Sequence, residues 1–160
     1  MPSAAGVLCL DFIHLVGDPS AFLESGPLSP RTQAEIRRFR TALRRLLEAE
    51  AAGVGGSERD LDSLNRILAQ AGARRGLRPT VRGYGWGWIG TQPDELARLL
   101  WPVAWSAARL LDSPDLVRLK GCDGCGRLFL DGSRNRSRRW CDKGGCGNRV
   151  NVARYRSRQR

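Results

Sequence analysis

The stretch CDGCGRLFLDGSRNRSRRWCDKGGC at residues 122–146 holds four of the five cysteines of this 160-residue chain. Their pattern is Cys122-x2-Cys125-x15-Cys141-x4-Cys146, which is two close pairs separated by fifteen residues. This spacing is typical of a tetrahedral zinc site with four thiolate ligands. Four protein ligands leave no coordination position open, so the pattern predicts one structural Zn²⁺. A redox-active Cys122–Cys125 pair is the alternative, and the presence of a second pair disfavours it.

The residues around the cysteines predict how the ligands are presented. Gly124 and Gly126 permit a tight turn at the first pair, between short strands that we expect at 117–122 and 127–130. The second pair flanks a glycine turn, and Cys146 is expected to begin the last helix. A knuckle on a hairpin with two further ligands at a helix start predicts a treble-clef-like zinc finger over residues 116–160, ending in a basic helix.

Length and composition allow one further domain beside this module. The chain is 41% hydrophobic and 27% charged, which is typical of globular proteins. Its apolar stretches are too short to predict a membrane span, and no secretory signal is evident. Cysteines grouped for metal binding favour a reducing compartment, so we expect a cytoplasmic protein.

Residues 1–115 are expected to form a mainly helical domain with a β-hairpin, which makes the fold class α+β. Residues 7–16 are dense in apolar residues and predict a short buried strand or the start of a helix. Ser29-Pro30 predicts a helix start, and Ser57 opens a capping-box sequence. Helical spacing returns over 93–111. The expected buried face of the helix after Pro30 consists of Ile36, Phe39, Leu43, Leu46 and Leu47.

The stretch LRPTVRGYGWGWIG at residues 77–90 changes to a period of two and predicts the hairpin. Trp86 and Trp88 share one face of the second strand. We expect them to cover the helices and to be largely buried, together with Trp101 or Trp105. The alternative is that the aromatic residues form a ligand pocket.

Two single residues of the first apolar run bear on the metal prediction. Cys9 has no nearby cysteine and is interpreted as a small buried hydrophobe. His14 is the only histidine, and without a partner histidine it is interpreted as a core or interface residue and not as a ligand.

The residues FLDGSRNRSRRWCDKGGCGNR at 129–149 resemble the CGNR zinc finger. The stretches LCLDF at 8–12, WPVAWSAARLL at 101–111 and SPDL at 113–116, with the Gly-Trp hairpin, resemble the ABATE domain of bacterial proteins that join it to this finger. The resemblance implies that Cys122, Cys125, Cys141 and Cys146 are the zinc ligands. It also implies a stress-induced transcription regulator, located in the bacterial cytoplasm with the nucleoid.

The charge distribution points to a polyanionic partner. The chain carries a net charge of +11 and has a pI near 10.8. Residues 120–160 contain 12 basic and 3 acidic residues and account for +9 of this charge, whereas residues 1–119 contribute +2. This asymmetry predicts nucleic-acid binding by the zinc module, with double-stranded DNA as the leading candidate. One short helix reads only a few base pairs, so we also expect a homodimer or a protein partner.

The candidate nucleic-acid contacts lie in the loop between the cysteine pairs and in the last helix. On a helical wheel, an amide-bearing stripe runs between two rows of arginines, which suits a major groove. The candidates are Arg134, Arg136, Arg138, Arg139, Asn148, Arg149, Asn151, Arg154, Tyr155, Arg156 and Arg158. RNA binding and a protein-interaction adaptor remain as alternatives. No phosphate-binding loop or activated nucleophile is evident, so we predict that the protein is not an enzyme.

Overall fold

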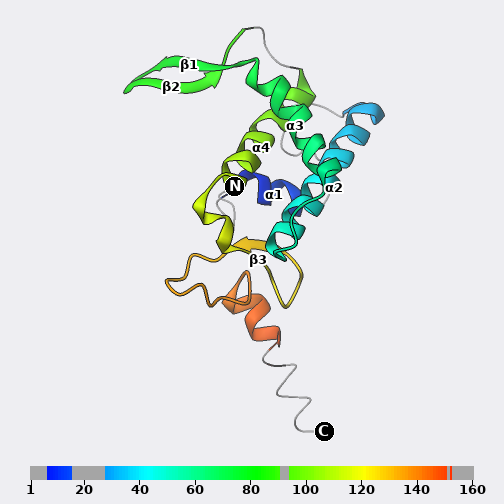
Figure 1. Ribbon diagram of the computed structural model, residues 1–160, viewed down its shortest axis with the longest axis vertical. Helices are drawn as coiled ribbons and strands as arrows, with labels where there is room; N and C mark the ends of the chain where they lie inside the picture. The colour runs from blue at the N-terminus through cyan, green and yellow to red at the C-terminus, as the bar shows by residue number, and fades with distance from the viewer. Residues whose placement is uncertain (1–6, 16–27, 91–93, 151, 153–160) are drawn as a thin grey trace.

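The computed structural model describes residues 7–15, 28–90, 94–150 and 152. The helices are α1 (Leu8–His14), α2 (Pro30–Ala51), α3 (Glu58–Gly72), α4 (Glu95–Leu111), the 3-10 helix η2 (Pro114–Arg118) and the π-helical turn η3 (Lys143–Gly147). The strands are β1 (Arg75–Thr80), β2 (Gly83–Trp88), β3 (Leu119–Gly121) and β4 (Leu128–Leu130), paired as two antiparallel hairpins. Figure 1 shows the helices α1 to α4 packed together, with β3 and the following segment at one end. The predicted α+β class is confirmed.

Local capping explains where the long helices begin. The Ser29 hydroxyl accepts a hydrogen bond from the backbone N–H of Thr32, and Pro30 occupies the first helical position. The Ser57 hydroxyl likewise caps α3 by accepting from the N–H of Asp60. Between the two helices, Gly53 adopts a φ of +72°, a left-handed conformation that glycine adopts readily. A helix cannot continue through this conformation, so α2 ends here.

The apolar run near the start of the chain forms a helix and not a strand. In α1, Cys9, Leu10, Phe12 and Ile13 are fully buried. The backbone N–H of Cys9 donates to the Ser106 hydroxyl on α4 at 3.2 Å. A buried seven-residue helix has few exposed positions, which is why its sequence lacks the alternation that separates a helix from a buried strand. The interpretation of Cys9 as a buried residue is confirmed.

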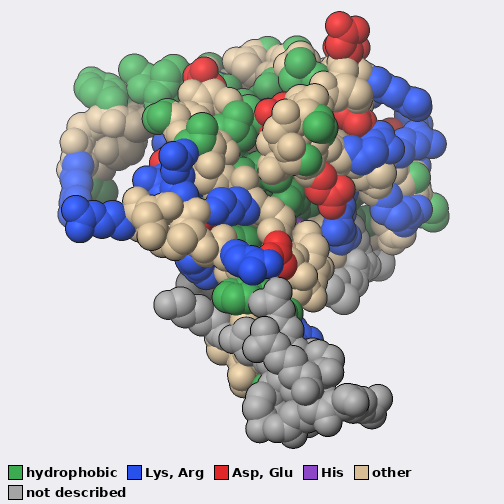
Figure 2. Space-filling model, turned by 60° about the horizontal axis from the view of Figure 1, so that its bottom comes forward, with side chains coloured by type: hydrophobic (Ala, Val, Ile, Leu, Met, Phe, Trp, Pro, Cys, Tyr) green, Lys and Arg blue, Asp and Glu red, His purple; other side chains and the backbone are tan. Residues whose placement is uncertain are grey.

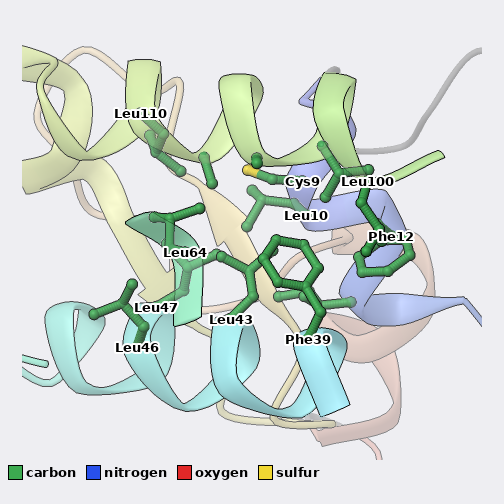
Figure 3. Close-up of a cluster of buried hydrophobic side chains, with 14 of the residues drawn as sticks. Cys9, Leu10, Phe12, Phe39, Leu43, Leu46, Leu47, Leu64, Leu100 and Leu110 are labelled. Carbon is green, nitrogen blue, oxygen red and sulfur yellow. The ribbon is translucent and has the colours of Figure 1, made fainter. Parts of the chain in front are cut away.

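One hydrophobic core joins all four α-helices, and it extends into the cysteine-bearing module. Figure 3 shows side chains of α1, α2, α3 and α4 meeting in its centre. The predicted face of α2 is buried as expected. Leu119 of β3 and Leu128 of β4 belong to the same core, with 4% and 2% of their surface exposed. The β3–β4 hairpin is therefore packed onto the four α-helices.

The hairpin β1–β2 extends away from the helices (Figure 1), and this corrects one prediction. Trp86 is 63% exposed, although we expected it to be buried. Trp88, at the base of the hairpin, is half-buried and contacts Trp101 with ring centroids 5.4 Å apart. The alternating sequence correctly predicts the two strands, but only the base of the hairpin contacts the helices. Among the described residues, none of the helices is long and apolar enough to cross a membrane.

Candidate metal centre and nucleic-acid interface

The hairpin β3–β4 presents the first two cysteines. The register pairs Gly121 with Leu128, so the chain reverses direction directly after β3. The N–H of Cys122 donates to the carbonyl of Arg127 at 2.9 Å, and the N–H of Gly126 donates back to the carbonyl of Cys122 at 2.8 Å. Gly126 has a φ of +69°, a value that side-chain-bearing residues rarely adopt. These bonds form the predicted knuckle.

Asp142 organises the turn that carries the last cysteine. Its carboxylate accepts hydrogen bonds from the N–H groups of Gly144 (3.2 Å) and Gly145 (2.6 Å), and its carbonyl accepts from Gly147. The helix continues over residues 148–150. Cys146 therefore lies at the start of the last helix, as expected, and Asp142 satisfies the free N–H groups of that end. The sequence analysis did not identify Asp142 in this role.

The four sulfur atoms converge on one point. All four lie within 4.8 Å of one another. The Sγ atoms of Cys125 and Cys141 are 3.7 Å apart, and those of Cys141 and Cys146 are 3.8 Å apart. A zinc ion bound tetrahedrally at about 2.3 Å from each sulfur requires edges of about 3.8 Å. The five cysteines are free thiols, so no disulfide competes for them. The donor set and its dimensions therefore fit zinc.

The local electrostatics favour a thiolate at Cys122 and disfavour one at Cys141. Burial acts to raise the pKa of Cys122, but hydrogen bonds from the N–H groups of Cys141 and Gly124 outweigh it and lower this pKa to about 6. Burial and the neighbouring thiols raise the pKa of Cys141 to about 12. The site stabilises one negative charge and opposes a second. A divalent cation compensates the repulsion between thiolates that raises the pKa of Cys141.

Aromatic and glycine residues pack against part of the cysteine cluster. Phe129 and Trp140 pack against the cysteines, so Trp140 covers part of the cluster. A Cβ atom at Gly124 would lie 3.2 Å from the Cβ of Cys146 and 3.3 Å from Val150, so the knuckle contacts the last helix closely. Cys122 and Cys146 are buried by this packing, Cys141 is half-buried, and Cys125 is exposed.

A buried carboxylate organises the arginine-rich loop. Asp131 is fully buried and accepts hydrogen bonds from the N–H and hydroxyl of Ser133, at 2.9 and 2.6 Å, and from the N–H of Arg138 at 2.8 Å. The Lys120 ammonium lies 2.9 Å from the same carboxylate. Burial acts to raise the pKa of Asp131, but these donors hold the pKa well below its ordinary value. Asp131 is thus a charged anchor that the sequence analysis missed.

Further bonds fix the loop backbone around that anchor. The Ser133 hydroxyl accepts from the N–H of Ser137 at 3.1 Å. Lys120 also donates to the carbonyls of Arg136 and Arg138. Arg136 has a φ of +52°, an uncommon conformation that these contacts maintain. The loop is therefore a defined structure with its arginines at set positions.

The predicted nucleic-acid residues differ in what they contact. Arg134, Arg136, Asn148 and Arg149 are exposed, although an Arg149 nitrogen also approaches the Cys146 sulfur at 3.4 Å. Arg139 is exposed and pairs with Asp123 at 2.7 Å. The remaining candidates, Asn151, Arg154, Tyr155, Arg156 and Arg158, lie outside the described residues.

Arg138 is a structural part of the knuckle. It is half-buried, and its guanidinium donates to the carbonyl of Cys141 at 2.8 Å and lies 5.4 Å from the ring centroid of Phe129. Substituting Arg138→Ala is expected to lower zinc affinity about 10- to 100-fold, as loss of a residue supporting metal ligands typically does. Competition with a chromogenic chelator measures this affinity. Arg134→Ala removes the same charge from an exposed position and serves as the control; an equal loss in both variants would contradict the structural role.

His14 links the helical body to this module. It is half-buried, and its Nε2 lies 3.0 Å from the carbonyl oxygen of Leu128 in β4. Burial lowers its pKa, which favours the neutral ring. This contact accounts for His14 as an interface residue, as the sequence analysis interpreted it.

Comparison with known families agrees with the geometry. A family model described as "CGNR zinc finger" matches residues 118–159. The ABATE family model, described as "Putative stress-induced transcription regulator", matches residues 6–114. No curated protein matches the chain. Because the second model covers more than half of the 160 residues, the chain belongs to the ABATE family, and a CGNR zinc finger follows its ABATE domain.

Proposed function

We propose that this protein is a transcription regulator that binds double-stranded DNA through the zinc module at residues 116–160. Residues 1–115 form the body that carries this module, and one zinc ion per chain holds its ligands together. The observation that carries the proposal is the arginine loop at residues 133–139. Its backbone is anchored by buried Asp131, while Arg134 and Arg136 remain exposed.

The acidic residues of the module are engaged internally. Asp123 pairs with Arg139, Asp131 is buried beside Lys120, and Asp142 caps the turn at Cys146. These are the three acidic residues between positions 120 and 160, against twelve basic ones. Figure 2 shows Lys and Arg side chains spread over the face that it presents, with Asp and Glu side chains between them. The net charge of residues 120–160 is +9, and four thiolates with one zinc ion add a charge of about −2. The module therefore keeps a net charge of roughly +7, which favours binding of a polyanion.

Preorganisation favours phosphate binding by the loop. A flexible arginine segment loses conformational entropy when it binds, whereas a loop already fixed by hydrogen bonds loses less. Asn148 and Arg149 are exposed on the first turn of the last helix, and asparagine can pair with adenine while arginine contacts phosphate or guanine. We extend the interface to Asn151, Arg154, Tyr155, Arg156 and Arg158 from their spacing in the sequence alone.

A charge-matched pair of variants tests the proposal. In Arg134→Ala/Arg136→Ala, two phosphate contacts are lost, so duplex affinity at 0.1 M salt should fall about 50-fold and the salt slope should become shallower by about 1.8. Arg59→Ala/Arg66→Ala removes two exposed arginines from α3 and should change neither quantity appreciably. Fluorescence anisotropy of labelled duplex DNA at several salt concentrations measures both.

Other ligands distinguish the proposal from its alternatives. The zinc-loaded protein should bind duplex DNA more tightly than single-stranded RNA or an acidic peptide of equal charge. Tighter binding of RNA would contradict the choice of DNA. Binding of the peptide without either nucleic acid would indicate an adaptor. Equal losses in the two double variants would show that total charge, and not the arginine loop, determines affinity.

A further inference from the structure

Two hollows stand out on the described surface, and they differ in chemistry. A groove of about 1100 Å³ runs along α2 and α3, where arginines and carboxylates alternate. Among its lining residues, Arg45 is already paired with Asp60 at 2.5 Å, and Glu35 is paired with Arg31 at 3.6 Å. A second cleft of about 480 Å³ lies where the base of the β1–β2 hairpin meets α4. Its lining includes Arg75, Trp88, Trp105, Ser106, Arg109 and Leu130, and we name it the indole cleft.

Arg75 of β1 is held between two indole rings. Its Cζ atom lies 4.7 Å from the ring centroid of Trp88 and 5.3 Å from that of Trp105. Its Nε is buried and has no hydrogen-bond partner in the described part of the protein. A buried donor without a partner is unfavourable, and native structures contain few of them. The rings orient this guanidinium, but they leave its capacity to donate unsatisfied.

The charge of the cleft favours an anion. Arg109 in the last turn of α4 supplies a second cation to the lining. The carboxylate in the lining, Asp115, is paired with Arg118 at 3.3 Å, so its charge is partly compensated. The Ser106 hydroxyl accepts from the N–H of Cys9 at 3.2 Å and also bonds the Cys9 side chain, so this polar group of the lining is already partnered. The polar groups of the cleft are therefore predominantly donors.

The remaining lining is apolar and flat. Trp105, Leu130 and Trp88 contribute ring and aliphatic surface beside the two guanidinium groups. A volume of about 480 Å³ is in the range of small-molecule sites, which combine an apolar lining with a few convergent polar groups. Guanidinium groups bind carboxylates in a planar, two-pronged geometry.

We propose that the indole cleft binds a small organic acid, with its carboxylate on Arg75 and Arg109 and an apolar, preferably aromatic, body against Trp105 and Leu130. This site is independent of the DNA interface proposed above. Its lining spans the helical body and β4 of the zinc module, so a bound acid contacts both.

Titration of the zinc-loaded full chain with benzoate tests this assignment. The ¹⁵N–¹H indole resonances of the five tryptophans provide the readout, assigned by Trp88→Phe and Trp105→Phe. Benzoate at up to about 10 mM should shift the Trp88 and Trp105 signals. Benzamide, which has the same shape without the charge, should bind at least about tenfold more weakly because it cannot form the charged pair.

Variants separate binding from folding. Arg75→Gln and Arg109→Gln should each weaken benzoate about tenfold or more. Arg82→Gln removes an exposed arginine from the turn of the same hairpin and should leave the affinity unchanged. Arg75 also contacts two rings, so a loss of binding in Arg75→Gln can result from an unfolded hairpin. Weaker benzoate binding in Arg109→Gln at a wild-type melting temperature therefore decides whether the charge of the cleft is needed. Absence of shifts with benzoate, equal binding of benzamide or inorganic phosphate, or an equal loss in Arg82→Gln would overturn the proposal.

Discussion

Replacement of Cys122 or Cys146 by serine is expected to abolish stoichiometric zinc binding. Both residues are buried in the cluster, and their sulfurs belong to the set within 4.8 Å of one another. Structural zinc sites of this kind contribute apparent binding free energies of about 10–16 kcal/mol, so losing one of four ligands is a large perturbation. Elemental analysis after gel filtration should give about one zinc per wild-type chain and far less in either variant.

Cys9→Ala provides the matched control. Cys9 is buried like Cys122 and Cys146, with 0% of its surface exposed against 4% and 6%, but it packs in the helical core. Its substitution should leave the zinc content unchanged. A full equivalent of zinc in Cys122→Ser, or loss of zinc in Cys9→Ala, would contradict the four-cysteine assignment.

Removal of zinc by a chelator is expected to unfold the region after Ser113 first. Trp140 packs against the cysteine cluster and is the one tryptophan of the chain beyond that residue, so its indole resonance reports on the module. We expect this signal to move to its unfolded position while those of Trp101 and Trp105 in α4 change little, because α2, α3 and α4 retain most of their mutual contacts. Simultaneous loss of all the signals would indicate that the body requires zinc as well.

Leu128→Ala is expected to lower the free energy of unfolding of the whole chain by about 2–5 kcal/mol, as large-to-small substitutions in cores do. Leu128 belongs to β4 of the zinc module, yet it is 2% exposed and packs in the core formed by the four α-helices. A cavity there should weaken the helical body as well as the module. Urea denaturation followed by far-UV circular dichroism, with zinc in excess, measures the change.

The same substitution at an exposed leucine isolates the effect of burial. Leu77 on β1 is 62% exposed, so Leu77→Ala should change the free energy of unfolding by less than about 0.5 kcal/mol. If Leu128→Ala altered zinc affinity without altering the helical transition, the module and the body would be energetically separate despite their shared core.

Local sequence was sufficient for features that depend on neighbouring residues. The cysteine spacing predicted that the four cysteines lie together, since Cys122 and Cys125 converge through a turn of their own backbone. Ser29 and Ser57 identified helix starts, because a cap needs only a hydroxyl within reach of the following N–H groups. The family resemblance rested on the same contiguous motifs and agrees with the matched families.

The tertiary structure decided what depends on residues distant in the chain. Trp86 and Trp88 have the same alternation in the sequence, but only Trp88 meets α4, so one is exposed and the other packed. Arg134 and Arg138 look alike in the loop, yet Arg138 is committed to the backbone of the knuckle. A charged residue becomes structural when packing removes it from water and supplies its partners, and no local pattern encodes this. Sequence therefore determined the four-cysteine cluster and the helices. Packing determined which arginines face solvent, where the indole cleft lies, and that one core joins the α-helices to the β3–β4 hairpin.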